Sequence, residues 1–135
     1  MIRLDIPVVP MGAVRMTGRG KFVKSNAQRY LAYKEFLRWH AKSKLNNNPL
    51  MNGPLAVEIR FTMPIPQSWS KKKHDTAVGK YHTKKPDADN LVKGVFDSLN
   101  KIAWQDDNQV SQVTAIKIYG EKPGIEVKIH ELKGV

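Results

Sequence analysis

The chain has 135 residues, and its 23 Lys and Arg against 12 Asp and Glu give a formal net charge of +11. It contains no cysteine, which excludes disulfide bonds and thiolate metal sites, and no stretch approaches the roughly 18 apolar residues of a membrane helix. No signal peptide is recognised at the start, so we expect one soluble, cytoplasmic domain over residues 1–135, with no membrane partner. A positive charge of this size favours nucleic acid as the partner, with an ordinary solvated basic surface as the alternative.

The first half of the chain predicts two strands separated by a loop and a helix. Alternating apolar residues predict a strand over residues 2–6, and the clearest strand of the chain over residues 55–63. The glycines and basic residues from Met11 to Lys24 are typical of a flexible loop. Residues 25–44 have the spacing of an amphipathic helix, with Leu31 on its apolar face and Trp39 in its packing.

The second half adds a basic segment, a helix and two strands. The segment from Gln67 to Lys85 is polar and very basic, and it predicts a surface loop or a short helix. A helix is predicted over residues 90–101, and two strands over residues 110–119 and 125–132, joined as a hairpin. This order predicts an α+β (mixed α/β) fold in which two helices pack on a small sheet.

Carboxylates are concentrated in one segment of this basic chain. Five of the seven aspartates lie within 21 positions, and these are Asp87, Asp89, Asp97, Asp106 and Asp107. Asp87 and Asp89 stand where the chain turns into a helix, so both side chains can converge on one point. If the chain returned Asp106 or Asp107 to that point, three or four carboxylates could hold a divalent cation such as Mg²⁺. Such a cation activates water and stabilises charge on a phosphate.

Simpler interpretations of the same residues stay open. Asp87 or Asp89 could only cap the helix, and the Asp106–Asp107 pair could only belong to a solvated turn. Asp97 lies four residues after Lys93, so a local ion pair between them is expected. Lys93 also lies one turn after Asp89, on the same helix face, where it could bind a phosphate.

Three pieces of this segment together resemble the RusA family of Holliday junction resolvases. They are Asp87-Ala88-Asp89-Asn90-Leu91-Val92-Lys93, Phe96-Asp97-Ser98-Leu99-Asn100-Lys101 and Trp104-Gln105-Asp106-Asp107-Asn108-Gln109-Val110. The family pattern is a D-x-D-N-L-x-K, a short helix containing F-D-x-L and a D-D-x-Q-V turn, and the chain matches all three with the same spacing. The segment from Gln67 to Lys85 is longer than the basic run in the best-known members, which affects the expected contacts with DNA and not the metal site.

The resemblance implies a homodimer that binds four-way DNA junctions and makes paired symmetric cuts in recombination and repair. It implies Mg²⁺ or Mn²⁺ as the cofactor, with no small-molecule cofactor, and Asp87, Asp89 and Asp107 as metal ligands. Asp106 is the reserve ligand, and the resemblance implies that Lys93 assists cleavage. Members of the family often come from prophages, so a bacterial or phage origin is expected.

Basic residues on both sides of the aspartates are expected to contact the DNA backbone without reading its sequence. These are Arg15, Arg19, Lys21, Lys71, Lys72, Lys73, Lys84 and Lys85. Two alternatives to a resolvase remain. One is a non-catalytic nucleic-acid-binding module whose aspartates are caps, and the other is a nuclease for different branched DNA.

Overall fold

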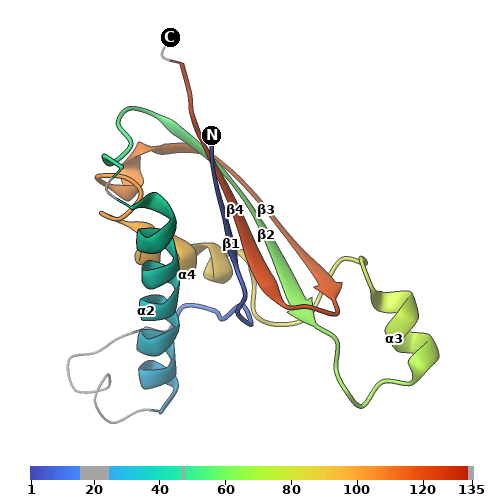
Figure 1. Cartoon of the computed structure of the whole chain (residues 1–135). Coiled ribbons are helices and arrows are strands. Elements are labelled where there is room, and N and C mark those ends of the chain that lie inside the picture. The colour runs from blue at the N-terminus through green and yellow to red at the C-terminus, as the bar shows by residue number, and fades with distance from the viewer. Residues whose placement is uncertain (16–24, 47, 134–135) are drawn as a thin grey trace.

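The computed structural model describes residues 1–15, 25–46 and 48–133 (Figure 1). The elements follow in the order β1 (Ile2–Ile6), α2 (Ser25–Leu45), β2 (Leu55–Pro64), α3 (Lys71–Ala77), α4 (Ala88–Leu99), the 3₁₀ turn η1 (Asp107–Gln109), β3 (Val110–Gly120) and β4 (Gly124–Glu131). The predicted α+β class is confirmed, and the basic segment before the aspartates contains the short helix α3. Two of the predicted DNA contacts, Arg19 and Lys21, lie outside the described residues.

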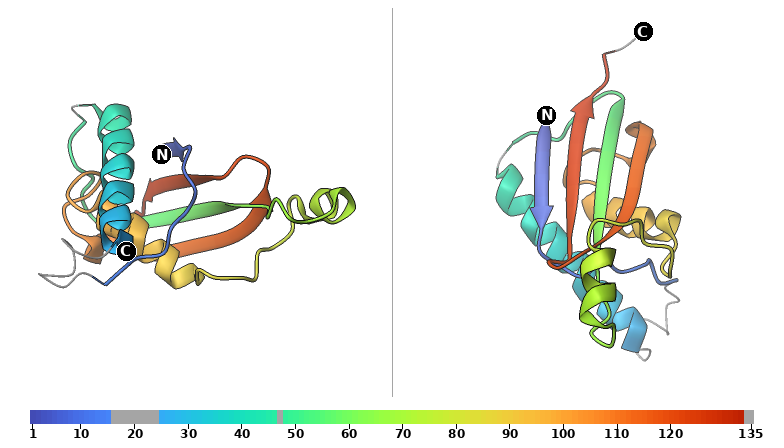
Figure 2. Two further views of the ribbon diagram at one scale, coloured as in Figure 1. Left: turned by 90° about the horizontal axis from the view of Figure 1, so that it is seen from below. Right: turned by 90° about the vertical axis from the view of Figure 1, so that its right-hand side faces the viewer.

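The strands form one sheet in the order β1-β4-β2-β3, and α2 and α4 lie on the same face of it (Figure 2). α2 contacts β1, α4 contacts β3, and the two helices contact each other. Val57, Ile59 and Phe61 of β2 face this layer and are at most 2% exposed, as the alternation of residues 55–63 predicts. The opposite face is polar, and Glu126 there pairs with Arg3 at 2.7 Å and with Arg60 at 3.1 Å.

The predicted hairpin between the last two strands is wrong. β3 pairs in parallel with β2, whereas β4 pairs antiparallel with both β2 and β1. β2 therefore lies between β3 and β4, and residues 121–123 cross over its end. Two alternating strands joined by a short turn are typical of a hairpin, and nothing in their local pattern reveals that a third strand separates them. One consequence is that β3 is an edge strand.

The outer surface of α2 also differs from prediction. Leu31 is 36% exposed and Trp39 is 62% exposed, while Tyr33 and Leu37 are buried against the sheet. Trp39 makes an edge-to-face contact with His40, with ring centroids 5.1 Å apart. The described helices include none that is both long enough and apolar enough to span a bilayer.

Candidate active site

Asp87 and Asp89 lie at the beginning of α4. Asp87 is the N-cap residue and has the extended backbone of that position, but its carboxylate accepts no cap hydrogen bond. Asp89 lies in the first turn of the helix. Both side chains are exposed in a shallow depression that Lys85 and Asn90 also line, and neither forms an ion pair within the described part of the chain. The capping interpretation thus explains the backbone of Asp87 and leaves the carboxylate oxygens available to an external ligand.

Lys117 of β3 holds the backbone that leads to Asp87. Its Nζ donates a hydrogen bond to the carbonyl oxygen of Lys84 at 2.7 Å and to that of Pro86 at 2.8 Å. Lys117 lies on the helix side of the sheet, because it is the register partner of the buried Phe61. Sequence reasoning missed this residue, since a lysine in a strand gives no signal of a bond to a backbone 31 positions away.

Replacing Lys117 with Met should release this backbone. Hydrogen bonds from a charged group contribute roughly 1.5–3 kcal/mol, so we expect an unfolding free energy lower by about 1–3 kcal/mol. Misplacement of the segment that carries Asp87 should also slow any DNA cleavage by about 10- to 100-fold. Denaturant unfolding and single-turnover cleavage measure the two effects. Lys117→Arg keeps the charge and the donors as the control, and unchanged cleavage by Lys117→Met would show that the anchor is not needed.

Residues 11–15 run beside the same end of α4. The Ala13 N–H donates to the Asn90 carbonyl oxygen at 3.2 Å, and Asn90 Nδ2 donates to the Ala13 carbonyl oxygen at 3.1 Å. Gly12 permits this approach, because a Cβ there would lie 2.6 Å from Asn90 Nδ2 and 3.0 Å from the Pro86 Cβ. Arg15 is exposed two residues after Ala13, so a predicted DNA contact far away in sequence is brought to the Asp87–Asp89 end of the helix.

Asp107 lies at the opposite end of α4. Its N–H donates at 3.1 Å to Oδ1 of Asn100, which is the C-cap residue of the helix. Its Oδ1 accepts a hydrogen bond of 2.7 Å from Trp104 Nε1. The chain enters α4 from the side of α3 and leaves it on the far side (Figure 1), and a helix of 12 residues is about 18 Å long.

The three predicted metal ligands are therefore not brought together within one chain. Asp87 and Asp89 are adjacent, whereas Asp107 is separated from them by the length of α4. Within residues 1–15, 25–46 and 48–133, no three His, Asp or Glu side chains lie close enough to hold a metal ion. The convergence that the sequence analysis required does not occur in a single copy of the chain.

The two adjacent aspartates after α4 have different surroundings. Burial raises the pKa of the half-buried Asp107 carboxyl; the Trp104 N–H opposes this rise, and Asp97 and Asp106 add to it. Asp106 is exposed, and its carboxylate caps η1 by accepting a 3.0 Å hydrogen bond from the Asn108 N–H. The oriented and shielded carboxylate is that of Asp107, which favours it over the reserve ligand Asp106.

Asp97 does not pair with Lys93 as predicted. The Tyr30 hydroxyl donates to its Oδ2 at 3.1 Å, and burial together with Asp97 raises the pKa of that tyrosine, so it stays a donor. Lys93 is exposed one turn after Asp89 and forms no ion pair with a described residue. Its ammonium is thus available at the Asp89 end of the helix.

The described basic residues that were predicted to bind DNA are all exposed. Lys84 and Lys85 directly precede Asp87, and Lys71, Lys72 and Lys73 belong to α3, which projects beyond the end of β2 (Figure 1). Lys73 Nζ lies 4.1 Å from the centroid of the Trp69 ring, within the range of a cation–π interaction.

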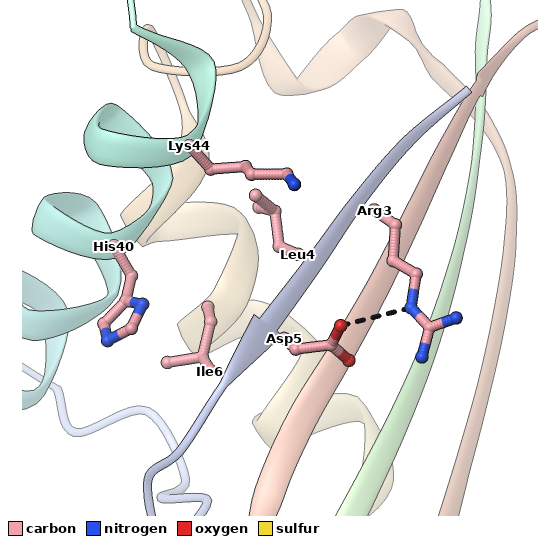
Figure 3. Close-up of a pocket in the computed structure, with 6 residues that line it drawn as sticks. All are labelled: Arg3, Leu4, Asp5, Ile6, His40 and Lys44. Carbon is pink, nitrogen blue, oxygen red and sulfur yellow. Dashed lines mark hydrogen bonds and ion pairs between the residues drawn. The ribbon is translucent and has the colours of Figure 1, made fainter.

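The small cavity in Figure 3 is separate from these residues. It lies between β1 and α2, where Leu4, Ile6, His40 and Lys44 line it. Its one carboxylate is paired, since Asp5 Oδ2 lies 3.2 Å from Arg3 Nε. β1 is the edge of the sheet opposite to β3, so the cavity adds nothing to the aspartates around α4.

Comparison with known proteins agrees with the resemblance of the sequence motifs. The family model for endodeoxyribonuclease RusA matches residues 5–130. The uncharacterized protein YqaN of Bacillus subtilis (strain 168) is 34% identical over 127 residues, which cover 91% of this chain and 87% of that protein. The crossover junction endodeoxyribonuclease rusA of Lactococcus phage r1t is 34% identical over 82 residues, which cover 60% of this chain and 57% of the phage protein. The family match includes both ends of α4 and all of β3.

Proposed function

Since the chain belongs to the RusA family of endodeoxyribonucleases, we propose that it is a metal-dependent nuclease that resolves four-way DNA junctions. As a homodimer it would cut one strand per protomer, so that the two cuts are symmetric. The observation that carries the proposal is the pair of carboxylates, Asp87 and Asp89, at the start of α4 in a chain of net charge +11. Neither forms an ion pair with any of the described residues. Uncompensated carboxylates suit a hard divalent cation, and the basic surface around them suits DNA.

Asp87, Asp89 and Asp107 are the proposed ligands of Mg²⁺ or Mn²⁺. The side chains of Asp87 and Asp89 are exposed and have no ion-pair partner among residues 1–15, 25–46 and 48–133. The carboxylate of Asp107 is oriented by the Trp104 N–H, as metal-binding carboxylates commonly are. Within one chain, however, Asp107 lies too far from Asp87 and Asp89 to share a cation with them, because the length of α4 separates them. When bound, the cation would supply an activated water and stabilise charge on the phosphate. Lys93, one turn after Asp89, would bind a phosphate oxygen as a point charge.

The described basic residues would hold the DNA backbone on either side of the aspartates. Arg15, Lys84 and Lys85 lie at the same end of α4 as Asp87, and Lys71–Lys73 extend the basic surface along α3. Backbone contacts of this kind position a duplex without reading bases. Recognition of the shape of the junction is therefore the proposed basis of substrate choice.

Cleavage of a synthetic four-way junction tests the proposed function. We expect paired symmetric nicks in the presence of Mg²⁺ or Mn²⁺, and none after chelation. A linear duplex of the same sequence should stay intact, while a panel of flaps and forks distinguishes a junction resolvase from a nuclease for other branched DNA. Tight binding of the junction without nicks in either metal would support the non-catalytic module.

Removing two lysines of α3 should weaken DNA binding. With Lys71 and Lys72 changed to Gln, the slope of log junction affinity against log salt concentration should become shallower by up to about 2. Each lost phosphate contact removes about 0.9 from that slope. Binding titrations over a range of KCl concentrations measure it. Replacing Lys42 and Lys44 of α2 in the same way gives the control of equal net charge, and an equal effect of both pairs would show general electrostatics in place of a contact by α3.

A further inference from the structure

The outer face of α2 carries aromatic side chains that the core does not use. The side chains that α2 buries recur every three or four residues and include Tyr33, Leu37 and Ala41. Trp39 lies two residues from both Leu37 and Ala41, so at about 3.6 residues per turn it points to the opposite side of the helix. It is 62% exposed, and Phe36, one turn before it, is 36% exposed. The helix is therefore apolar on two sides, and the described part of the chain covers one of them.

Three rings form a contiguous group on this outer face. The ring centroid of His40 lies 4.8 Å from that of Phe36 and 5.1 Å from that of Trp39, and both contacts are edge-to-face. The His40 ring supports the indole of Trp39 from one side, while most of the indole stays open to solvent. A shallow depression beside the rings is lined by Ala32, Glu35, Phe36, Arg38, Trp39 and Lys42.

Positive charges surround these rings. α2 contains five Lys and Arg residues and one acidic residue. Arg38 and Lys42 are both exposed and lie one turn apart along the depression. No residue of α2 forms an ion pair with any residue that the structure describes. Uncompensated cations beside exposed rings are typical of a surface for an anionic ligand that carries flat, apolar groups.

This face lies at a distance from the beginning of α4. Lys42 of α2 lines a depression together with Lys101 and Ile102, which follow α4. The C-terminal half of α2 is therefore beside the end of α4 that is opposite to Asp87. α2 also contacts β1, the edge of the sheet opposite to β3 (Figure 2). A ligand on the outer face of α2 would thus leave the depression at Asp87 open.

We propose that the outer face of α2 binds single-stranded DNA, with the Trp39 ring stacked on an unpaired base and with Arg38 and Lys42 in contact with the neighbouring phosphates. An aromatic ring accepts any base, because every base has a flat face, and cationic side chains hold the backbone. Branched substrates such as flaps and forks contain unpaired strands of this kind. The choice of DNA as the anionic ligand rests on the proposed function, whereas the rings and charges of α2 do not depend on it.

The spacing of the two cations suits one strand of DNA. Arg38 and Lys42 are four residues apart, which is about 6 Å along the helix axis at 1.5 Å per residue. Phosphates follow one another about every 3.4 Å along the axis of a stacked strand. The two cations can therefore contact phosphates that are one or two nucleotides apart. Trp39 lies between them in the sequence, where a base of the same stretch of backbone can reach its ring.

Two other occupants fit this face less well. A second copy of α2 would bring two helices with five cations each together, and contact between like charges is unfavourable. A folded acidic protein would need about 800 Å² of surface on each side. The large apolar side chains that α2 exposes are Leu31, Phe36 and Trp39, and two of these are little more than one-third exposed. Stacking of a base, in contrast, requires one ring.

Trp39→Ala tests the site. The full chain is titrated, with EDTA present so that no strand is cut, against a labelled oligothymidine of about 15 nucleotides. Loss of the stacking ring should weaken binding by about 5- to 100-fold. Affinity for a blunt duplex of the same length should stay within about twofold of the parent chain, because paired bases are not free to stack. Since Trp39 is an exposed residue, the far-ultraviolet circular dichroism spectrum should not change.

Three controls separate stacking from charge and from exposure. Trp39→Phe keeps a ring and should retain most of the affinity that Trp39→Ala loses. Tyr81→Ala removes another exposed ring next to a lysine, since Tyr81 is 74% exposed and follows Lys80, but no described ring lies in contact with it. It should bind oligothymidine as the parent chain does. A strand of abasic sites, which has phosphates and no bases, should bind the parent chain as weakly as oligothymidine binds Trp39→Ala.

Tryptophan fluorescence locates the bound strand by a second measurement. The chain has three tryptophans, of which Trp104 is fully buried and Trp69 packs on Tyr119 with ring centroids 5.4 Å apart. Oligothymidine should quench the fluorescence of the parent chain and of Trp69→Phe to a similar extent. The quenching should disappear in Trp39→Phe, although this variant still binds the strand.

Several results would overturn the site. They are a parent chain that does not bind oligothymidine, an equal loss of strand and duplex binding in Trp39→Ala, an equal loss in Tyr81→Ala, undiminished binding of the abasic strand, and quenching that requires Trp69 in place of Trp39. Polyglutamate that competes as well as oligothymidine would show a site for acidic chains and would also overturn it. A chain that binds the strand through Trp39 but cuts no branched DNA would remove the proposed function and leave the site. One that cuts junctions without binding oligothymidine would do the reverse.

Discussion

Asp89→Asn should abolish most junction cleavage while junction binding persists. Asn has nearly the same size and is accepted in the first turn of a helix, so α4 should still form. The substitution removes one of two adjacent negative charges that the proposed cation requires. Residues that only support a metal ligand cost between about 10- and 100-fold, so we expect the loss of a direct ligand to cost at least about 100-fold. Removing a negative charge near the DNA phosphate should leave binding unchanged or slightly tighter.

Single-turnover cleavage and gel-shift titration measure these two outcomes separately. Asp75→Asn is the matched control, because Asp75 is an exposed carboxylate on a helix at a distance from Asp89, with His74 at 3.3 Å as its partner. It should cleave at the rate of the parent chain. If Asp89→Asn lost folding, binding and cleavage in equal proportion, Asp89 would be a structural residue of the helix start and not a ligand.

The helices and strands were predictable from the sequence because each depends on a local pattern. The alternation of residues 55–63 corresponds to β2, and the helical spacing of residues 25–44 corresponds to α2 within one residue. The order of the strands was not predictable in this way. β2 lies between β3 and β4 because it pairs with both, and nothing in the sequence of either strand indicates this pairing.

The candidate site shows the same division. The resemblance of the motifs named Asp87, Asp89 and Asp107, but no local pattern contains the distance between the two ends of α4 that separates Asp107 from the other two in the folded chain. The bond between Tyr30 and Asp97 and the bonds from Lys117 to the backbone before Asp87 follow from the packing of α2, α4 and β3. Sequence spacing instead favoured a pair between Asp97 and Lys93, because it considers one helix alone.

A mixture of Asp89→Asn and Asp107→Asn chains should recover cleavage that neither variant has by itself. If each site takes Asp87 and Asp89 from one copy and Asp107 from the other, a heterodimer contains one site with both substitutions and one intact site. About a quarter of all sites in an equimolar mixture are then intact, since half of the dimers are mixed. An intact site on one side of the dimer makes one nick per junction in place of paired cuts.

Both variant chains in this mixture, Asp89→Asn and Asp107→Asn, should fold normally. In Asp107→Asn, the amide oxygen can still accept a hydrogen bond from the Trp104 N–H. The substitution also removes a carboxyl whose pKa is raised by burial, so that its ionised form is disfavoured in the folded chain. Ionisation of this carboxyl lowers the free energy of unfolding as the pH rises through the range in which it loses its proton. Replacing it with Asn should therefore not lower the free energy of unfolding near neutral pH.

The arrangement of the substitutions decides between a shared site and a site within one chain. If one chain held all three carboxylates, every site in the mixture would carry a substitution and no nick would appear. Mixing Asp87→Asn with Asp89→Asn is the control, because both changes fall at the same end of α4 and leave no intact combination in either arrangement. Recovery in the first mixture and none in the second requires that Asp107 act from the partner, since no other distribution of the three residues gives that pair of results.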